Sequence, residues 1–79
     1  MTELTLLNRY ACHLCEDMLL SLQDYATELH FKVTLVDIDD NPELQQVYNE
    51  AVPVLMYNGR EVCRHLLDPQ ALREALAAP

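Results

Sequence analysis

The sequence has few cysteines, few basic side chains and no long apolar run, and each shortage excludes a class of protein. Three cysteines are too few, and an odd number, for the disulfide framework of a small secreted domain. Five Lys and Arg against 13 Asp and Glu give a formal net charge of −8, which disfavours nucleic acid and anionic membranes as partners. No apolar run approaches the roughly 20 residues that span a bilayer, and no secretory signal opens the chain. We therefore expect a cytoplasmic protein.

The remaining composition is that of a folded domain. Hydrophobic residues make up 51% of the chain and charged residues 23%, which is ordinary for a globular protein and excludes a mainly disordered one. A length of 79 residues suits one domain with a small core. We expect a single domain over residues 1–79, acting as a monomer.

Strand and helix patterns alternate in the first half of the chain. Residues 4–7 form a short apolar run typical of a buried strand, and residues 31–37 form a β-branched stretch typical of a second strand. Apolar side chains between them recur at helical spacing, which predicts an amphipathic helix and a right-handed βαβ unit. The inward-facing residues of this helix are Cys15, Met18, Leu19, Leu22, Ala26 and Leu29.

Capping and turn signals organise the second half. A capping side chain followed by proline occurs at residues 39–42 and again at Asp68-Pro69, and each predicts the start of a helix. Asn58-Gly59 predicts a tight hairpin between two antiparallel strands. The expected elements are a helix ending near Ala51, strands over residues 54–57 and 61–63, and a last helix from Pro69. The expected order is β-α-β-α-β-β-α, an α/β fold.

The stretch Cys12-His13-Leu14-Cys15 lies where the first strand pattern gives way to the first helix pattern. At a helix start, unpaired N–H groups and the helix dipole favour the thiolate of Cys12. One helical turn brings Cys15 to the same face, where the two thiols can form a disulfide. A structural metal site and simple burial of two small side chains are the alternatives. A zinc site would need four ligands, and the rest of the chain offers only Cys63 and scattered histidines.

The sequence resembles glutaredoxin-like members of the thioredoxin superfamily over nearly its whole length. Three features carry the resemblance: the Cys12–Cys15 motif after the first strand, Val52-Pro53 opening the third, and Asn58-Gly59 joining it to the fourth. The resemblance implies a thioredoxin-like, glutaredoxin-type fold with a four-stranded mixed sheet flanked by helices. It also implies a cis bond before Pro53, with Pro53 against the disulfide.

The resemblance further implies a redox-active centre and an oxidoreductase that contributes to cell redox homeostasis. Cys12 is the expected nucleophile and Cys15 the resolving thiol, and the substrate is a disulfide in a protein or a small molecule. Glutathione or a thioredoxin-type reductase would supply electrons, with no bound cofactor and no metal. The alternative is a non-enzymatic binding domain that holds a metal or cluster.

Several residues near the cysteines are candidates for substrate binding. Arg9 stands where many glutaredoxins have a lysine that meets a glutathione carboxylate. Residues 63–67 lack the glycines and acidic pair that let glutathione approach in that family, so we expect glutathione to bind weakly. Tyr10 borders a substrate groove or packs in its loop, and His13 favours a thiolate or is an exposed loop side chain. Val52 and Pro53 complete the candidate set. Cys63 is expected to be a small buried hydrophobe.

Overall fold

The computed structural model describes residues 2–77. Four strands, three α-helices and one 3-10 turn follow the expected order, so the predicted β-α-β-α-β-β-α arrangement is confirmed. No helix within residues 2–77 combines the length and apolar character needed to cross a membrane. The elements are β1 (Thr2–Asn8), α1 (His13–Leu29), β2 (Phe31–Asp37), η1 (Ile38–Asp40), α2 (Pro42–Tyr48), β3 (Val54–Tyr57), β4 (Arg60–Arg64) and α3 (Pro69–Ala77).

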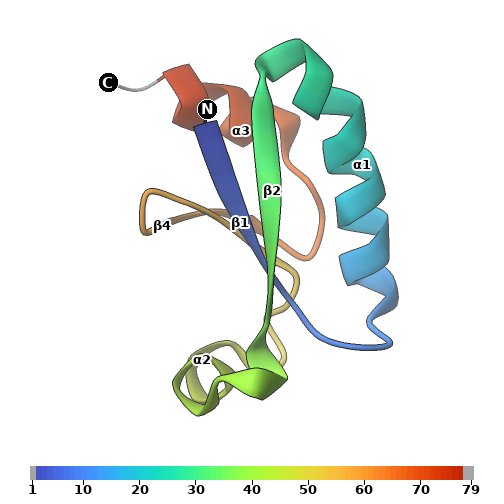
Figure 1. Ribbon diagram of the computed structural model, residues 1–79, viewed down its shortest axis with the longest axis vertical. Coiled ribbons are helices and arrows are strands. Elements are labelled where there is room, and N and C mark those ends of the chain that lie inside the picture. Colours follow the sequence, from blue (N-terminus) through green and yellow to red (C-terminus); the bar gives the residue numbers. More distant parts are fainter. Residues whose placement is uncertain (1, 78–79) are drawn as a thin grey trace.

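The strands form one mixed sheet in the order β2-β1-β3-β4. β1 pairs in parallel with β2, from Thr2 opposite Phe31 to Asn8 opposite Asp37. Two parallel neighbours need a crossover connection, and α1 provides it. β3 is antiparallel to both β1 and β4. In Figure 1, α2 lies at the bottom of the molecule, at the end of the sheet where α1 begins, and the start of β1 lies at the top.

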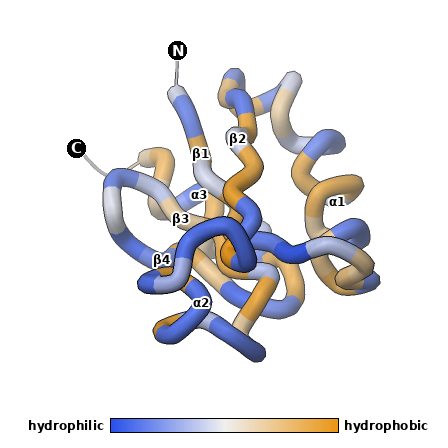
Figure 2. Tube along the Cα trace, turned by 60° about the horizontal axis from the view of Figure 1, so that its bottom comes forward, coloured by the Kyte–Doolittle hydropathy of each residue, from blue (hydrophilic) through white to orange (hydrophobic). Residues whose placement is uncertain are grey.

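Two apolar clusters cover the two faces of the sheet. Successive side chains of a strand point to opposite faces, so Leu6 and Leu7 of β1 enter different clusters. The first cluster joins the sheet to α1 and α3, and the second joins it to the residues around α2. Figure 2 shows α1 alternating between hydrophobic and hydrophilic residues as it winds, as an amphipathic helix does. The buried members of the first cluster are Leu4, Leu6, Met18, Leu22, Phe31, Leu55 and Leu72; those of the second are Leu7, Cys15, Ile38, Val52 and Val54.

The helix ends follow local capping chemistry. The side chain of Asn41 accepts hydrogen bonds from the N–H groups of Glu43 and Leu44, so Asn41 is the cap that begins α2. α2 ends at Tyr48 rather than near Ala51, and the Ala51 N–H donates to the Tyr48 carbonyl at 2.8 Å. The expected helix was therefore slightly too long, because the last residues form a turn instead.

The hairpin at Asn58-Gly59 is confirmed. Both residues have positive φ, 51° for Asn58 and 77° for Gly59, as a two-residue turn of this hand requires. A Cβ atom on Gly59 would meet nothing within 4 Å, so backbone conformation and not space favours glycine there.

Leu35 departs from the strand pattern. Phe31 is only 3% exposed, whereas Leu35, on the same side of the strand, is 48% exposed. β2 is an edge strand, so its side chains have a neighbouring strand on one side only. Its neighbour Val36 packs against the second cluster. The exposure of Leu35 therefore follows from the position of β2 at the edge of the sheet.

The packing of α1 predicts a contrast between two leucines two residues apart. Leu22 is fully buried, whereas Leu20 on the same helix is 62% exposed. Leu22→Ala should lower the free energy of unfolding by about 2–5 kcal/mol, because it removes apolar contacts and leaves a cavity. Leu20→Ala, the matched control, should change it by no more than about 0.5 kcal/mol. Urea denaturation followed by circular dichroism measures both, and equal losses would contradict this assignment of the core.

Candidate active site

Cys12 and Cys15 form a disulfide at the start of α1, with their Cα atoms 5.2 Å apart. Cys12 has an extended backbone and is the N-cap residue of the helix. Its Sγ accepts a hydrogen bond from the Cys15 N–H at 3.2 Å, and its carbonyl accepts one from the Glu16 N–H at 3.1 Å. The sulfur of Cys12 therefore lies where helix N–H groups favour negative charge.

The two cysteines differ in access to solvent. Cys12 is half-buried at the edge of the second cluster, whereas Cys15 is only 3% exposed and is one of its core members. Cys12 therefore presents more surface to solvent than Cys15 does. This asymmetry is what a nucleophile and a resolving thiol need.

The Val52–Pro53 bond is cis, as the resemblance implied. Pro53 is fully buried, and Val52 belongs to the same cluster as Cys15, against which Cys12 also packs. The Pro53 carbonyl accepts a hydrogen bond from the His65 N–H at 2.8 Å, which ties this segment to the residue after β4. The structure therefore brings the cysteine motif and the Val52-Pro53 segment together.

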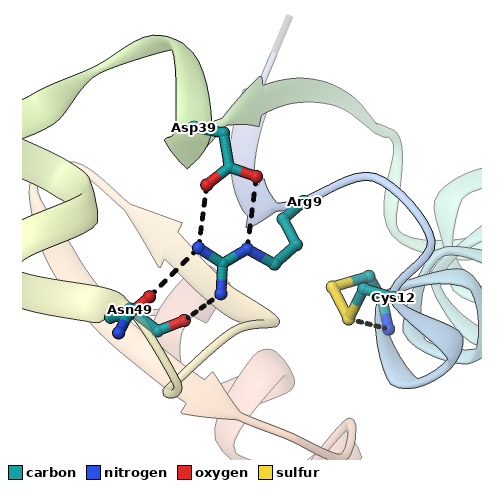
Figure 3. The surroundings of a disulfide bond; sticks show 5 residues. Arg9, Cys12, Asp39 and Asn49 are labelled. Atoms are coloured by element: carbon teal, nitrogen blue, oxygen red, sulfur yellow. Dashed lines mark hydrogen bonds and ion pairs between the residues drawn. A yellow bond between two sulfur atoms is a disulfide. The ribbon is translucent and has the colours of Figure 1, made fainter.

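Arg9 is bound within the protein. Its Nε and Nη2 donate to the two carboxylate oxygens of Asp39, at 3.3 Å and 2.8 Å. Its Nη1 and Nη2 donate to the backbone carbonyl and the side-chain oxygen of Asn49, at 2.8 Å and 3.0 Å. Figure 3 shows the guanidinium pointing toward Asp39 and Asn49, with the disulfide on the other side of the Arg9 backbone. These hydrogen bonds hold the pKa of the Asp39 carboxyl below its usual range and raise the pKa of Arg9.

Asp39, Asn49 and Gln45, whose Nε2 donates to Asp39 at 2.9 Å, were not identified from the sequence. The parallel pairing of β1 and β2 was the signal that could have found Asp39. It places Asn8 opposite Asp37, so Arg9 and Asp39 leave the same end of neighbouring strands. Asn49 follows α2 and carries no comparable sequence signal.

Tyr10 and His13 lie on the surface beside the disulfide. Tyr10 is 90% exposed, so it does not pack in its own loop. The His13 imidazole lies on the solvent side of α1, with its Nε2 3.5 Å from an Asp17 carboxylate oxygen one turn on. Leu14 and Leu66 are also exposed apolar side chains. Tyr10 and Leu14 stand two residues before and after Cys12.

Cys63 lies apart from the cysteine pair. It is on β4 opposite Leu55 and packs against the first cluster, on the other face of the sheet from the second. Burial raises the pKa of its thiol. The expectation of a small buried hydrophobe holds in part, because Cys63 packs against the core but is only partly buried.

A surface cavity lies away from the disulfide, and the described residues hold no cluster that suits a metal ion. Within residues 2–77, no three His, Cys, Asp or Glu side chains group closely enough to hold a metal ion. A cavity of about 460 Å³ lies between the β3–β4 hairpin and α3 and is lined by residues such as Tyr57, Arg60 and Ala71. Asn58-Gly59 is at the opposite end of β3 from Pro53, so this cavity is separate from the site.

The sheet order, the three helices, the cis-proline and the close cysteine pair together define a thioredoxin-fold protein with a redox-type centre. A family model described as glutaredoxin-like domain (DUF836) matches residues 3–77. The chain therefore belongs to this glutaredoxin-like family.

Solved structures agree with this assignment. The solution structure of protein Ne2328 from Nitrosomonas europaea is 35% identical, with a TM-score of 0.85 over 92% of this chain and 88% of that one. The X-ray structure of protein XcR50 from X. campestris is 40% identical, with a TM-score of 0.68 over 96% and 99% of the two chains. Thioredoxin 1 from Thermosipho africanus, 18% identical, matches 94% of this chain and 93% of its own with a TM-score of 0.62, which shows the shared fold.

The differing environments of the thiols predict an order of alkylation in the reduced protein. Iodoacetamide at pH 7 should label Cys12 first, because its sulfur is accessible and faces helix N–H groups. Cys15 should react slowly because it is 3% exposed. Cys63, whose pKa is raised by burial, should carry little thiolate at pH 7 and react faster as the pH increases. Peptide mass spectrometry over time measures the order, and faster labelling of Cys15 than of Cys12 would contradict the assigned roles.

Proposed function

We propose that this protein is a thiol–disulfide oxidoreductase that uses Cys12 and Cys15 to reduce or exchange disulfides. The observation that supports this most strongly is the disulfide at the N-terminus of α1, with one accessible sulfur and one buried sulfur. The glutaredoxin-like family and the thioredoxin fold support the same reaction class.

In the proposed reaction, the Cys12 thiolate attacks one sulfur of a substrate disulfide. The substrate S–S bond breaks, a Cys12–substrate mixed disulfide forms, and the other substrate sulfur leaves as a thiolate that takes up a proton. Cys15 then loses its proton and attacks the Cys12 sulfur, which releases the second substrate thiol and closes the Cys12–Cys15 disulfide. The substrate gains two electrons and the protein dithiol loses two.

A separate thiol must return the protein to the dithiol form. Glutathione or a thioredoxin-type reductase is the proposed class of reductant, supplying two electrons and two protons per cycle. Thiols are kept reduced in the cytoplasm, so a cytoplasmic location is part of this proposal.

Replacing each cysteine with serine tests the proposed roles in a single turnover. The reduced Cys12→Ser protein should not cleave a peptide disulfide, because the attacking thiol is missing. Cys15→Ser should cleave it once and accumulate as a mixed disulfide, because the intramolecular second step is missing. Mass spectrometry of the intact protein distinguishes the two products.

Cys63→Ser is the matched control and should react like the natural protein. Trapping of the peptide by Cys12→Ser but not by Cys15→Ser would reverse the assignment. Absence of any disulfide cleavage by the natural reduced protein would reject the proposed function.

A further inference from the structure

The positive charge nearest to Cys12 in the sequence is neutralised within the protein. A guanidinium has five N–H donors, and four hydrogen bonds run from Arg9 to Asp39 and Asn49. The two contacts to the Asp39 carboxylate pair a cation with an anion side by side (Figure 3). The pair carries no net charge toward a substrate at the disulfide.

The other cations leave the site without a free positive charge. Arg64 precedes His65, whose N–H donates to the Pro53 carbonyl. The Arg64 guanidinium donates two hydrogen bonds to the Glu61 carboxylate, of 2.7 Å and 2.6 Å. Of the Lys and Arg side chains within residues 2–77, all but Arg60 make an ion pair. Arg60 follows the Asn58-Gly59 turn, at the other end of β3 from Pro53. The whole chain has a net charge of −8. Anionic substrates are therefore repelled at long range and meet no free cation near the sulfur.

Exposed apolar side chains occur in the segments that form the site. Tyr10 is 90% exposed, Leu14 41% and Leu66 69%. Tyr10 and Leu14 flank Cys12 in the sequence, and Leu66 follows the residue whose N–H binds the Pro53 carbonyl. Exposed apolar side chains in the segments that carry the cysteine motif and follow β4 suit contact with side chains that flank a cysteine in a polypeptide.

Resting on the function proposed above, we propose that the Arg9–Asp39 pair is a specificity determinant that selects the substrate by charge. By neutralising Arg9, Asp39 removes attraction for anionic thiols such as glutathione. The site thereby favours disulfides in polypeptides whose flanking residues are neutral or basic.

The Arg9–Asp39 pair also holds segments of the site in position. Arg9 connects the loop that leads to Cys12 with η1, through Asp39, and with the end of α2, through Asn49. Asn49 lies shortly before the Val52-Pro53 segment. A test must therefore separate the charge of the pair from its role in holding these segments.

The natural protein provides the first test, without any mutation. Three peptide disulfides that differ only in flanking Lys, Ser or Glu residues are reduced in single-turnover reactions, beside oxidised glutathione. The second-order rate constant should fall in the order Lys, Ser, Glu, with the glutathione rate below that of the Ser peptide. The spread should be at least about threefold at low salt and should shrink at 0.5 M salt, roughly as charge screening demands. Equal rates for the three peptides would overturn the proposal.

Asp39→Asn provides the second test, because it removes the carboxylate that accepts hydrogen bonds from Arg9 and leaves only the weaker charge interactions with Asp37 and Glu50. Its rate with glutathione should rise by roughly threefold at low salt, while its rate with the Ser peptide should change by less. The double variant Arg9→Gln with Asp39→Asn should lose that gain, because the freed cation is absent. Asp39→Glu should behave like the natural protein.

Two carboxylate variants control for the change in net charge. Asp40→Asn neutralises an exposed neighbour in η1 that makes no contact with Arg9. Glu28→Gln releases Arg73 from an ion pair of 2.6 Å on other elements. Neither should raise the glutathione rate as Asp39→Asn does.

Different failures point to different errors. Equal slowing of glutathione and the Ser peptide by Asp39→Asn would show a purely structural role and overturn the specificity proposal. A matching gain in Asp40→Asn would show a general charge effect and also overturn it. Failure of the natural protein to reduce any of the four disulfides would instead reject the oxidoreductase function itself.

Discussion

Parallel pairing between β1 and β2 is the constraint on which the rest of the structure depends. It makes β1 an interior strand whose two faces enter two different apolar clusters. It also requires a crossover, which α1 supplies, and the crossover begins at the cysteine motif. Cys12 and Cys15 thus lie shortly after the end of an interior strand of the sheet. A disulfide at that point is supported by a buried strand below it and by helix N–H groups beside it.

The parallel register also determines the charges around the site. Because β1 and β2 end together, the residues that follow them meet, and Arg9 finds Asp39 although 30 positions separate them. The carboxyl ends of parallel strands are where many α/β proteins assemble their sites. Here that end holds a neutralised cation, an accessible sulfur and exposed apolar side chains. The same topology that builds the site therefore also sets what kind of molecule it attracts.

Features that depend on neighbours in sequence could be predicted, and features that depend on tertiary contacts could not. The cysteine motif, the Asn58-Gly59 turn and the start of the last helix follow from local chemistry. The cysteine motif and this turn, together with Val52-Pro53, carried the family resemblance, which implied the cis bond before Pro53. Leu35 could not be placed, because its exposure depends on β2 being at the edge of the sheet. The partners of Arg9 required the strand register and the end of α2. Sequence identified Arg9 as a candidate but not the carboxylate that pairs with it.

The separation of Cys63 from the other two cysteines has a consequence for how the chain matures. Three thiols in an unfolded chain can combine into three different intramolecular disulfides. In the folded chain Cys63 packs against the first cluster, whereas Cys12 and Cys15 pack together at the second and form the disulfide. The folded structure therefore favours the Cys12–Cys15 disulfide over the two disulfides that include Cys63. A chain that folds before it oxidises therefore forms the Cys12–Cys15 disulfide. A nascent chain that oxidises before it folds can instead form a disulfide that includes Cys63.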